Sequence, residues 1–291
     1  MNDPGFDHDL THDHDEAGPP KGADGRNLKA AIVTGVVLGG AVLALLAVSA
    51  GAFFALAAVI ILVAQGEFYM GARKAGRDPA IPLGLVAGAV LLAGVFLRGE
   101  QAAGLVLFLT LLFTFVWYLV SERRAADPVA EVAVTLFGVA YVPLLGAFAG
   151  LLVRRPDGAG VIVAMILATA VYDIGAYAGG SRYGRHKLAP TISPNKTTEG
   201  TVAATLLTLV VGSIAAALLG PWDTFGQALA FSALVCVAAP LGDLAESMIK
   251  RDFGTKDMGT IFPGHGGALD RIDAMLFVAP ATYLSLRAFG I

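Results

Sequence analysis

The chain has 291 residues, of which 56% are hydrophobic and only 15% are charged, and its mean hydropathy is +0.71. A soluble domain does not carry so much apolar surface, so the composition excludes a soluble globular protein and indicates an all-α, polytopic bundle of membrane helices. The single cysteine, Cys236, excludes a disulfide framework and a thiolate metal site, and the net charge of −3 owes its sign mostly to the N-terminal tail.

Residues 1–28 form an acidic, histidine-rich tail that contains almost no apolar residue to bury, so we expect it to be disordered. His8, His12 and His14 among carboxylates are a weak candidate for transition-metal binding, because a flexible tail loses much entropy on ordering. No basic segment followed by a short apolar stretch and a small-residue cleavage site is present. We therefore expect no cleaved signal peptide, and the first apolar run is interpreted as a retained anchor.

Nine apolar segments follow, each close to the 20 or so residues that a membrane-spanning helix needs. They are residues 30–48, 52–70, 80–97, 103–120, 129–153, 160–178, 201–219, 225–249 and 272–290. The first two are nearly continuous. We divide them at residues 49–51 because a single helix over positions 30–64 would rise about 52 Å, far beyond a bilayer core of roughly 30 Å.

The positions of lysine and arginine support this division. With nine spans and a cytoplasmic N-terminus, 16 of the 20 Lys and Arg residues fall on the cytoplasmic side, and only Arg98, Arg154, Arg155 and Arg287 fall on the other. The positive-inside rule turns this asymmetry into an orientation. We therefore expect the N-terminus in the cytoplasm and the C-terminus outside.

The chain also divides in character near residue 156. Residues 29–156 have short connections, and their spans contain little beyond Ala, Leu, Val, Gly and Phe. Residues 157–291 contain two long polar connections on the cytoplasmic side, and ionisable residues continue into the adjoining helices. We therefore expect an N-terminal transmembrane region, 29–156, and a catalytic transmembrane region, 157–291.

The eighth expected span ends in APLGDLAESMIKRD, where Asp243, Glu246, Ser247 and Lys250 have the spacing of one helix face. A carboxylate inside a spanning helix is costly and almost always faces a cavity, an ion or a partner. The alternative is mutual neutralisation of Asp243 and Lys250. Their separation of about 10 Å along the helix is too long for a direct pair, so a functional face is the better interpretation.

A glycine-rich segment, Gly-His-Gly-Gly at 264–267, leads into the ninth span, whose N-terminus favours anions. Asp270 and Asp273 flank Arg271 there, and acidic groups at a phosphate site are expected where Mg²⁺ is bound by carboxylates and phosphates together. The alternative is that they are ordinary first-turn acids that stabilise the helix dipole. His265 has the chemistry of a general acid or base, or of a donor to phosphate.

The connection between the sixth and seventh spans is the second polar segment. Asp173 and Tyr177 share a helix face, and a basic cluster follows at residues 182–196, which would also suit anionic lipid head groups. Residues 193–199 have the pattern of a turn followed by helix-capping residues. Together the two segments suit a site for a phosphate-bearing lipid and a metal-bound nucleotide, and phosphoryl transfer needs no protein nucleophile when a substrate phosphate attacks.

Residues 247–273, SMIKRDFGTKDMGTIFPGHGGALDRID, closely resemble the signature of the phosphatidate cytidylyltransferases, also called CDP-diacylglycerol synthases. Tyr172-Asp173, Ala176-Tyr177 and residues 193–200 also match, so the resemblance covers roughly residues 159–291. Two positions depart from the family pattern. Ala268 stands where a larger aliphatic residue is usual, and Asn195 stands where lysine is frequent, which leaves Lys196 as the nearer candidate for phosphate contact.

The resemblance implies the reaction of CTP with phosphatidic acid to give CDP-diacylglycerol and pyrophosphate, with Mg²⁺ and, in some members, a monovalent cation such as K⁺. The metal-binding aspartates of the family map onto Asp243 and Asp270. The expected catalytic set is Asp243, Lys250, Arg251, Lys256, Asp257, His265, Asp270, Arg271 and Asp273. The expected substrate-binding set is Asp173, Tyr177, Ser193, Lys196, Thr197, Ser247, Gly264, Gly266 and Gly267.

The expected partners are CTP, phosphatidic acid, the lipid bilayer and a second copy of the chain, with no nucleic acid; the small-residue spacings Gly35, Gly39 and Gly84, Gly88 would permit close helix packing. We expect a site that faces the cytoplasm from the plasma membrane, which the lipid enters sideways from the inner leaflet. The alternatives are a related CTP-using membrane enzyme, such as a prenol kinase or an ether-lipid cytidylyltransferase, and an ion-coupled transporter. A transporter would place polar residues in the far half of several spans, whereas here they cluster at the cytoplasmic end.

Overall fold

The computed structural model describes residues 39–121, 127–259 and 266–291, and every structural statement below concerns these residues. The expected disordered tail, residues 1–28, and positions 30–38 of the first expected span lie outside them. Two expected site residues, Gly264 and His265, also lie outside them.

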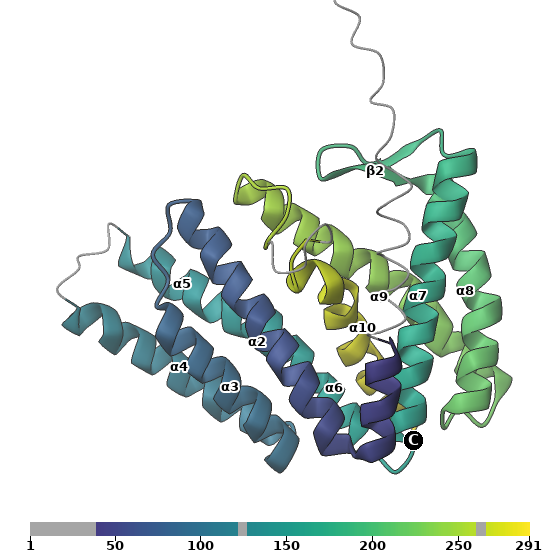
Figure 1. The fold of residues 1–291 in the computed structure, drawn as a ribbon, viewed down its shortest axis with the longest axis horizontal. Coiled ribbons are helices and arrows are strands. Elements are labelled where there is room, and N and C mark those ends of the chain that lie inside the picture. The colour runs from purple at the N-terminus through teal and green to yellow at the C-terminus, as the bar shows by residue number, and fades with distance from the viewer. Residues whose placement is uncertain (1–38, 122–126, 260–265) are drawn as a thin grey trace, which may run out of the picture. The chain divides into compact units, whose positions relative to one another are not determined.

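The described chain is almost wholly helical, which confirms the expected all-α class. After a short apolar helix, Gly39–Val48, the elements are α2 (Ala50–Lys74), α3 (Ile81–Arg98), α4 (Gln101–Val120), α5 (Pro128–Val139), η1 (Ala140–Leu144), α6 (Leu145–Val153), α7 (Gly158–Tyr183), β1 (Lys187–Ala189), β2 (Ser193–Thr197), α8 (Thr198–Leu219), α9 (Phe225–Asp252) and α10 (Leu269–Ala288). Figure 1 shows their arrangement.

Among the described residues, seven helices are long and apolar enough to cross a membrane when α5, η1 and α6 are taken as one run, Pro128–Val153. The protein is therefore a polytopic α-helical membrane protein. Two of the nine expected spans are not among the seven. The first is described only from Gly39 onward, and α10 carries three charged residues, Asp270, Arg271 and Asp273, near its start.

Two local features explain how the first half of the chain is divided. Ser49 separates the first short helix from α2, and its side chain accepts a hydrogen bond from the Ala52 N–H at 3.0 Å, so the predicted break at 49–51 is confirmed. Pro143 lies inside η1, a single π-helical turn between α5 and α6. Proline cannot donate the backbone hydrogen bond of a regular helix, and a π-turn is a common way to accommodate it.

A short antiparallel hairpin connects α7 to α8 and was not expected. Lys187 pairs with Thr197 and Ala189 with Ser193. The predicted cap is present, since the Thr197 side chain accepts a hydrogen bond from the Gly200 N–H at 3.2 Å and begins α8. The strand itself contains Pro194 and Asn195, both poor strand formers, and so short an element has no detectable periodicity.

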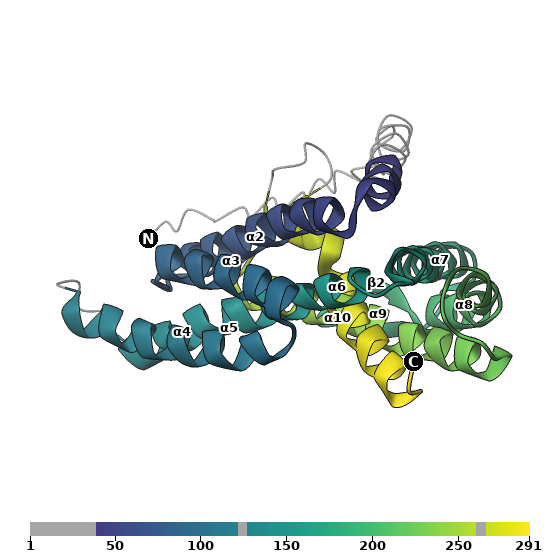
Figure 2. The ribbon, with the colours of Figure 1, turned by 90° about the horizontal axis from the view of Figure 1, so that it is seen from below.

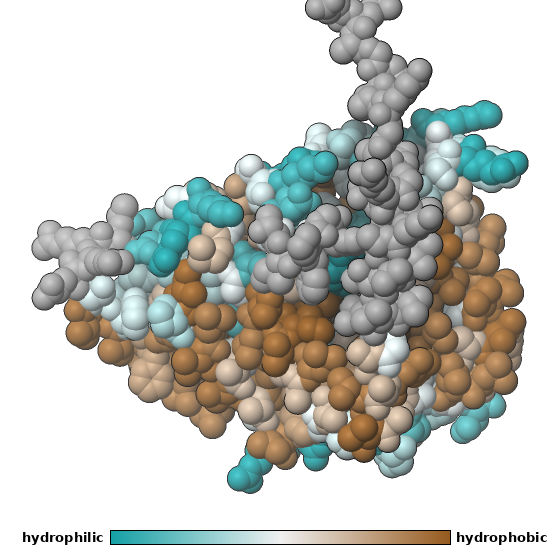
Figure 3. Space-filling model, viewed as in Figure 1, coloured by the Kyte–Doolittle hydropathy of each residue, from teal (hydrophilic) through white to brown (hydrophobic). Residues whose placement is uncertain are grey.

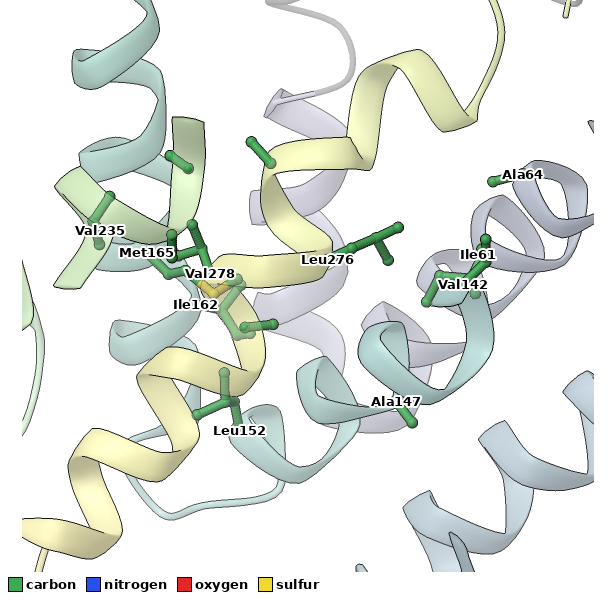
Figure 4. Packing of buried hydrophobic residues seen from close by; sticks show 14 of the residues in the cluster. Ile61, Ala64, Val142, Ala147, Leu152, Ile162, Met165, Val235, Leu276 and Val278 are labelled. Atoms are coloured by element: carbon green, nitrogen blue, oxygen red, sulfur yellow. The ribbon is translucent and has the colours of Figure 1, made fainter. Parts of the chain in front are cut away.

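Helix α10 lies at the centre of the packing. It contacts α2, α6, α7 and α9, while α7 and α8 run closely side by side and α9 packs on both (Figures 1 and 2). In the close view, Val278 of α10 lies beside Met165 of α7, and Leu276 lies on the side toward α2 (Figure 4). The core thus connects the N-terminal region directly to the two helices that carry the polar residues.

Hydrophobic side chains form a broad belt, and hydrophilic residues gather along its upper edge, with fewer along its lower edge (Figure 3). One set of helix ends is held together by arginines: Arg287 Nη1 binds Glu100 Oε1 at 2.6 Å, Arg154 donates to the Phe96 carbonyl and Arg155 donates to the Ile291 carbonyl at 3.2 Å. These are three of the four arginines expected on the side opposite the polar loops. Their grouping at one end agrees with the predicted alternation of the helices.

Two of the four glycines proposed for helix pairing between copies pack against side chains of the same chain, whereas a Cβ atom at Gly39 would meet nothing within 4 Å and Gly35 lies outside the described residues. A Cβ atom at Gly84 would overlap the Tyr69 hydroxyl, and one at Gly88 would overlap the Gln65 side chain. Both positions therefore serve the packing of α3 on α2. Dimerisation stays a prediction that rests on the family resemblance.

Candidate active site

The polar face predicted for the end of α9 is present. The Ser247 hydroxyl donates to Asp243 Oδ1 at 3.4 Å, and Lys250 Nζ donates to Glu246 Oε2 at 2.6 Å, one helical turn apart in each case. Lys250 therefore bonds with Glu246 rather than neutralising Asp243. Glu246 is only 1% exposed, so this ion pair is buried between helices.

Lys250 also connects α9 to the first turn of α10. Its Nζ lies 2.8 Å from Asp270 Oδ1, while Asp270 Oδ2 accepts the backbone N–H groups of Gly267 at 2.7 Å and Met258 at 3.3 Å. One ammonium thus bridges two carboxylates, Glu246 and Asp270. The second oxygen of Asp270 fixes the glycine segment, in which Gly266 has a φ of 77° that other residues rarely adopt.

A further acidic residue, Asp273, is positioned by the close packing of the α9 and α10 backbones. At Gly242 a Cβ atom would lie 2.5 Å from the Asp273 carbonyl oxygen and 2.9 Å from the Ala274 Cα atom, so only glycine permits α9 and α10 to approach so closely. Asp243 follows Gly242 directly. The crossing therefore places Asp273 of α10 beside the polar face of α9, where its Oδ1 accepts the Ala274 N–H at 2.8 Å.

The hairpin supplies a second lysine. Lys196 Nζ on β2 lies 2.6 Å from Asp243 Oδ2, and both side chains are partly exposed. They line a pocket of about 280 Å³ together with Tyr172, Asp173, Tyr177 and Thr197. The predicted meeting of the two polar segments is therefore what the structure shows, and Asp173, Tyr177, Lys196 and Thr197 share one pocket.

The remaining expected residues differ in their exposure and in their contacts. Arg251 is exposed, but its Nε donates to the Ile192 carbonyl at 3.2 Å and links α9 to the hairpin. Ser193 begins β2 and is half-buried, and Arg271 has an exposed side chain in the first turn of α10. Lys256 and Asp257 are exposed, and within the described residues no side-chain bond joins them to the carboxylate cluster.

Sequence reasoning missed two residues of the N-terminal region. Glu67 on α2 is 6% exposed, and its Oε2 accepts the Leu269 N–H at 2.9 Å. The Tyr141 hydroxyl is buried without a partner among the described residues, within electrostatic reach of Glu246, Asp243 and Asp273. Glu67 could have been found, because a carboxylate in an otherwise apolar span is itself a signal of function.

The described residues contain no group of three or more His, Cys, Asp or Glu side chains arranged to hold a metal ion. What they contain instead is carboxylates that converge on positive charges, since Lys250 Nζ lies between Glu246 and Asp270 and Lys196 Nζ lies on Asp243. Carboxylate oxygens are the donors that Mg²⁺ prefers. The donor set therefore fits a hard cation, although each donor has a lysine partner here.

The fold and the site together define a class: multi-span α-helical membrane proteins with a carboxylate and lysine centre where two long helices meet a polar hairpin. Residues 29–289 match the Cytidylyltransferase family, and the chain belongs to that family. It is thus an enzyme of nucleotidyl transfer, as the resemblance in residues 247–273 predicted.

Several relatives carry the same specific name. A phosphatidate cytidylyltransferase of Mycobacterium leprae is 38% identical over 273 residues, which is 87% of this chain and 85% of the relative. One of Mycobacterium bovis is 36% identical over 278 residues, or 90% of this chain and 89% of the relative. One of Helicobacter pylori is 44% identical over a shorter stretch of 138 residues, or 47% and 51% of the two chains. The predicted family is confirmed.

Proposed function

We propose that this protein is a phosphatidate cytidylyltransferase that makes CDP-diacylglycerol and pyrophosphate from CTP and phosphatidic acid, at the cytoplasmic face of the plasma membrane. One observation carries the proposal: Lys196, Lys250 and three carboxylates join both polar segments into one centre where α9 meets the first turn of α10. A centre in that position can be reached by a water-soluble nucleotide and by a lipid head group whose chains stay in hydrocarbon.

In the proposed reaction, an oxygen of the phosphatidate phosphate attacks the α-phosphorus of CTP. The new P–O bond forms as the bond from the α-phosphorus to the bridging oxygen breaks, and pyrophosphate leaves with the electron pair. The protein's contribution is to position the phosphates and to stabilise their charge. Lys196 and Lys250 are the cations best placed to do so, with Arg251 and Arg271 at the rim.

Asp243 and Asp270 are the residues that would hold Mg²⁺. Bound there, the ion would neutralise part of the triphosphate charge. Lys196 and Lys250, which bind these two carboxylates, would bind the substrate phosphates. A monovalent cation such as K⁺ is the second ion that the resemblance implies.

The lipid would reach the centre through the pocket between α7, the hairpin and α9. Tyr177 at its edge is 80% exposed in the absence of a bilayer and would face lipid. A Tyr side chain with an apolar ring and a polar hydroxyl suits the depth of the lipid head groups.

The test uses the protein purified in detergent with radiolabelled CTP, Mg²⁺ and phosphatidic acid, and follows label into the lipid phase. We expect label in CDP-diacylglycerol, dependent on Mg²⁺. A folded protein that transfers label to a polyprenol or an ether-lipid phosphate but not to phosphatidic acid would contradict the proposed substrate and would leave the family assignment intact.

A further inference from the structure

Glu67 is a buried carboxylate in the region of the chain with the least polar character. It lies on α2 and is 6% exposed, and its Oε1 atom has no hydrogen-bond partner among the described residues. A buried carboxylate with an unpaired oxygen is costly. The contacts described for its carboxylate give a reason for its presence.

Among the described residues, the Glu67 carboxylate contacts the segment that leads into α10. Glu67 Oε2 accepts the Leu269 N–H at 2.9 Å across a sequence separation of 202 residues. A Cβ atom at either Gly259 or Gly267 would overlap the Glu67 carboxylate. Glycine at these two positions therefore has a physical reason, because the carboxylate fills the space that any larger residue would need.

Helix α10 lacks an N-terminal cap of its own. Ala268 occupies the cap position with helical backbone angles and has no side chain to accept a hydrogen bond. The first N–H groups of a helix need such an acceptor, and a negative charge there also stabilises the helix dipole. Glu67 supplies the acceptor from another helix, at Leu269, the first residue of α10.

The capped residue is next to the catalytic centre. Leu269 directly precedes Asp270, and the Gly267 N–H that donates to Asp270 belongs to a glycine packed against Glu67. Asp270 in turn binds Lys250 at 2.8 Å. The position of Asp270 is therefore set from two sides, by Lys250 of α9 and by Glu67 of α2.

We propose that Glu67 is a positioning residue for this centre: its carboxylate caps α10 from α2 and holds the Gly267–Asp270 turn in register with Lys250. The activity part of this proposal rests on the proposed function. It assigns the N-terminal region a part in positioning the site, since Glu67 on α2 would hold the start of α10 and the remaining spans would hold α2 in place.

The test compares two substitutions with opposite changes. Glu67→Gln keeps the length and an acceptor oxygen but loses the charge, whereas Glu67→Asp keeps the charge but withdraws it by one methylene. A cap predicts that Glu67→Gln stays within about threefold of the wild-type kcat, while Glu67→Asp and Glu67→Ala lose about 10- to 100-fold, because a small misplacement of reacting groups is that costly. The KM for CTP should change less than kcat.

Glu131 provides a matched control. It is also 6% exposed and also accepts a backbone N–H, that of Asp78 at 2.7 Å, but Asp78 lies in the connection between α2 and α3 rather than in the segment that leads into α10. Glu131→Ala should lower the midpoint of thermal unfolding about as much as Glu67→Ala and leave kcat per folded molecule unchanged. Equal losses of kcat in the two alanine variants would reduce Glu67 to a packing role and overturn the proposal.

Amide hydrogen exchange gives a readout that does not depend on turnover. The peptide that contains Gly267 to Asp273 should exchange faster in Glu67→Asp and Glu67→Ala than in Glu67→Gln, the wild type or Glu131→Ala. If the wild type transfers nothing to phosphatidic acid, the proposed function fails while this exchange measurement still tests the cap. An active Glu67→Asp beside an inactive Glu67→Gln would mean that the charge matters rather than the cap, and unchanged exchange in Glu67→Ala would also overturn the proposal.

Discussion

The two regions of the chain satisfy their buried polar groups in different ways. In the N-terminal region the partners are mostly backbone atoms: Gln65 Nε2 donates to the Gly84 carbonyl at 2.9 Å, and the Tyr69 hydroxyl donates to the Thr135 carbonyl at 2.7 Å. In the C-terminal region buried hydroxyls also bind backbone, as Thr169 does on the Met165 carbonyl at 2.9 Å, but the lysines and carboxylates of the centre have opposite charges as partners. Backbone bonds fix one helix against another, whereas ionic partners can be exchanged for a substrate or an ion.

This difference suggests a division of labour in which the first half is a frame and the second half holds the reactive charges. Glu67 is the exception, because it is a charged residue of the frame that binds the backbone of the reactive half. Substitutions in either half test this division.

Asp270→Asn is expected to have the largest effect on activity. It keeps the size of the side chain but removes the charge that Lys250 and the proposed Mg²⁺ both need, so kcat should fall by about 10³-fold or more, as happens when a charge-stabilising group is lost. Asp243→Asn should lower kcat to a similar extent. The measurement is transfer of label from CTP to phosphatidic acid.

Asp223→Asn is the matched control for the aspartate variants, because Asp223 is an exposed carboxylate in the connection between α8 and α9. Its activity should equal that of the wild type. If Asp270→Asn also kept full activity, the C-terminal carboxylates would be structural in the same way as those of the frame, and the division between the regions would fail.

Lys250→Met should reduce stability most. It leaves Glu246, which is 1% exposed, without its cation, and removing one partner of a buried pair costs about 3–5 kcal/mol. The double variant Lys250→Met, Glu246→Gln should recover much of this loss and still be inactive. Thermal unfolding followed beside the transfer assay would separate the two effects, and a double variant that regained activity would show that Lys250 is not needed for phosphate binding.

Some of this site was predictable from sequence because its members lie on one element. Helical spacing alone placed Asp243, Glu246, Ser247 and Lys250 on one face, and the contacts within that face confirm it. Spacing carries no information across elements. It could not tell that Lys250 would bond with Asp270 of α10, or that Lys196 would reach Asp243 from a strand.

Prediction of the fold had the same limit, because contacts between distant elements leave no local pattern in the sequence. The apolar segments were enough to find the seven long helices of the described residues, because bilayer thickness sets the length of a span, while the orientation taken from the positive-inside rule stays a prediction. The hairpin was missed since its strands are too short to show a period, and the partner of Glu67 lies 202 residues away. The metal ligands, the second cation and the dimer stay predictions.

Tyr69→Phe tests the frame with a smaller effect. The variant keeps the ring, which is fully buried, and removes the hydrogen bond to the Thr135 carbonyl, so stability should fall by about 1–2 kcal/mol. Activity per folded molecule should not change, because the bond joins α2 to α5 and touches no residue of the centre. A large loss of kcat at unchanged stability would mean that the frame takes part in the chemistry beyond Glu67.

The smallest expected effect lies at the opposite end of the helices, where Arg287 hydrogen-bonds to Glu100 and lowers the pKa of that carboxyl below its usual 4.5. A carboxyl whose pKa is lower in the folded state stabilises the fold above its unfolded pKa, and this contribution is lost as the pH falls through the folded pKa. The unfolding midpoint of Glu100→Gln should therefore lie slightly below that of the wild type at pH 7, and the two should converge as the pH falls through the lowered folded pKa of Glu100. Because both side chains are exposed, added salt should shrink the difference at pH 7. A difference that persisted in acid or in salt would point to packing rather than charge at this end.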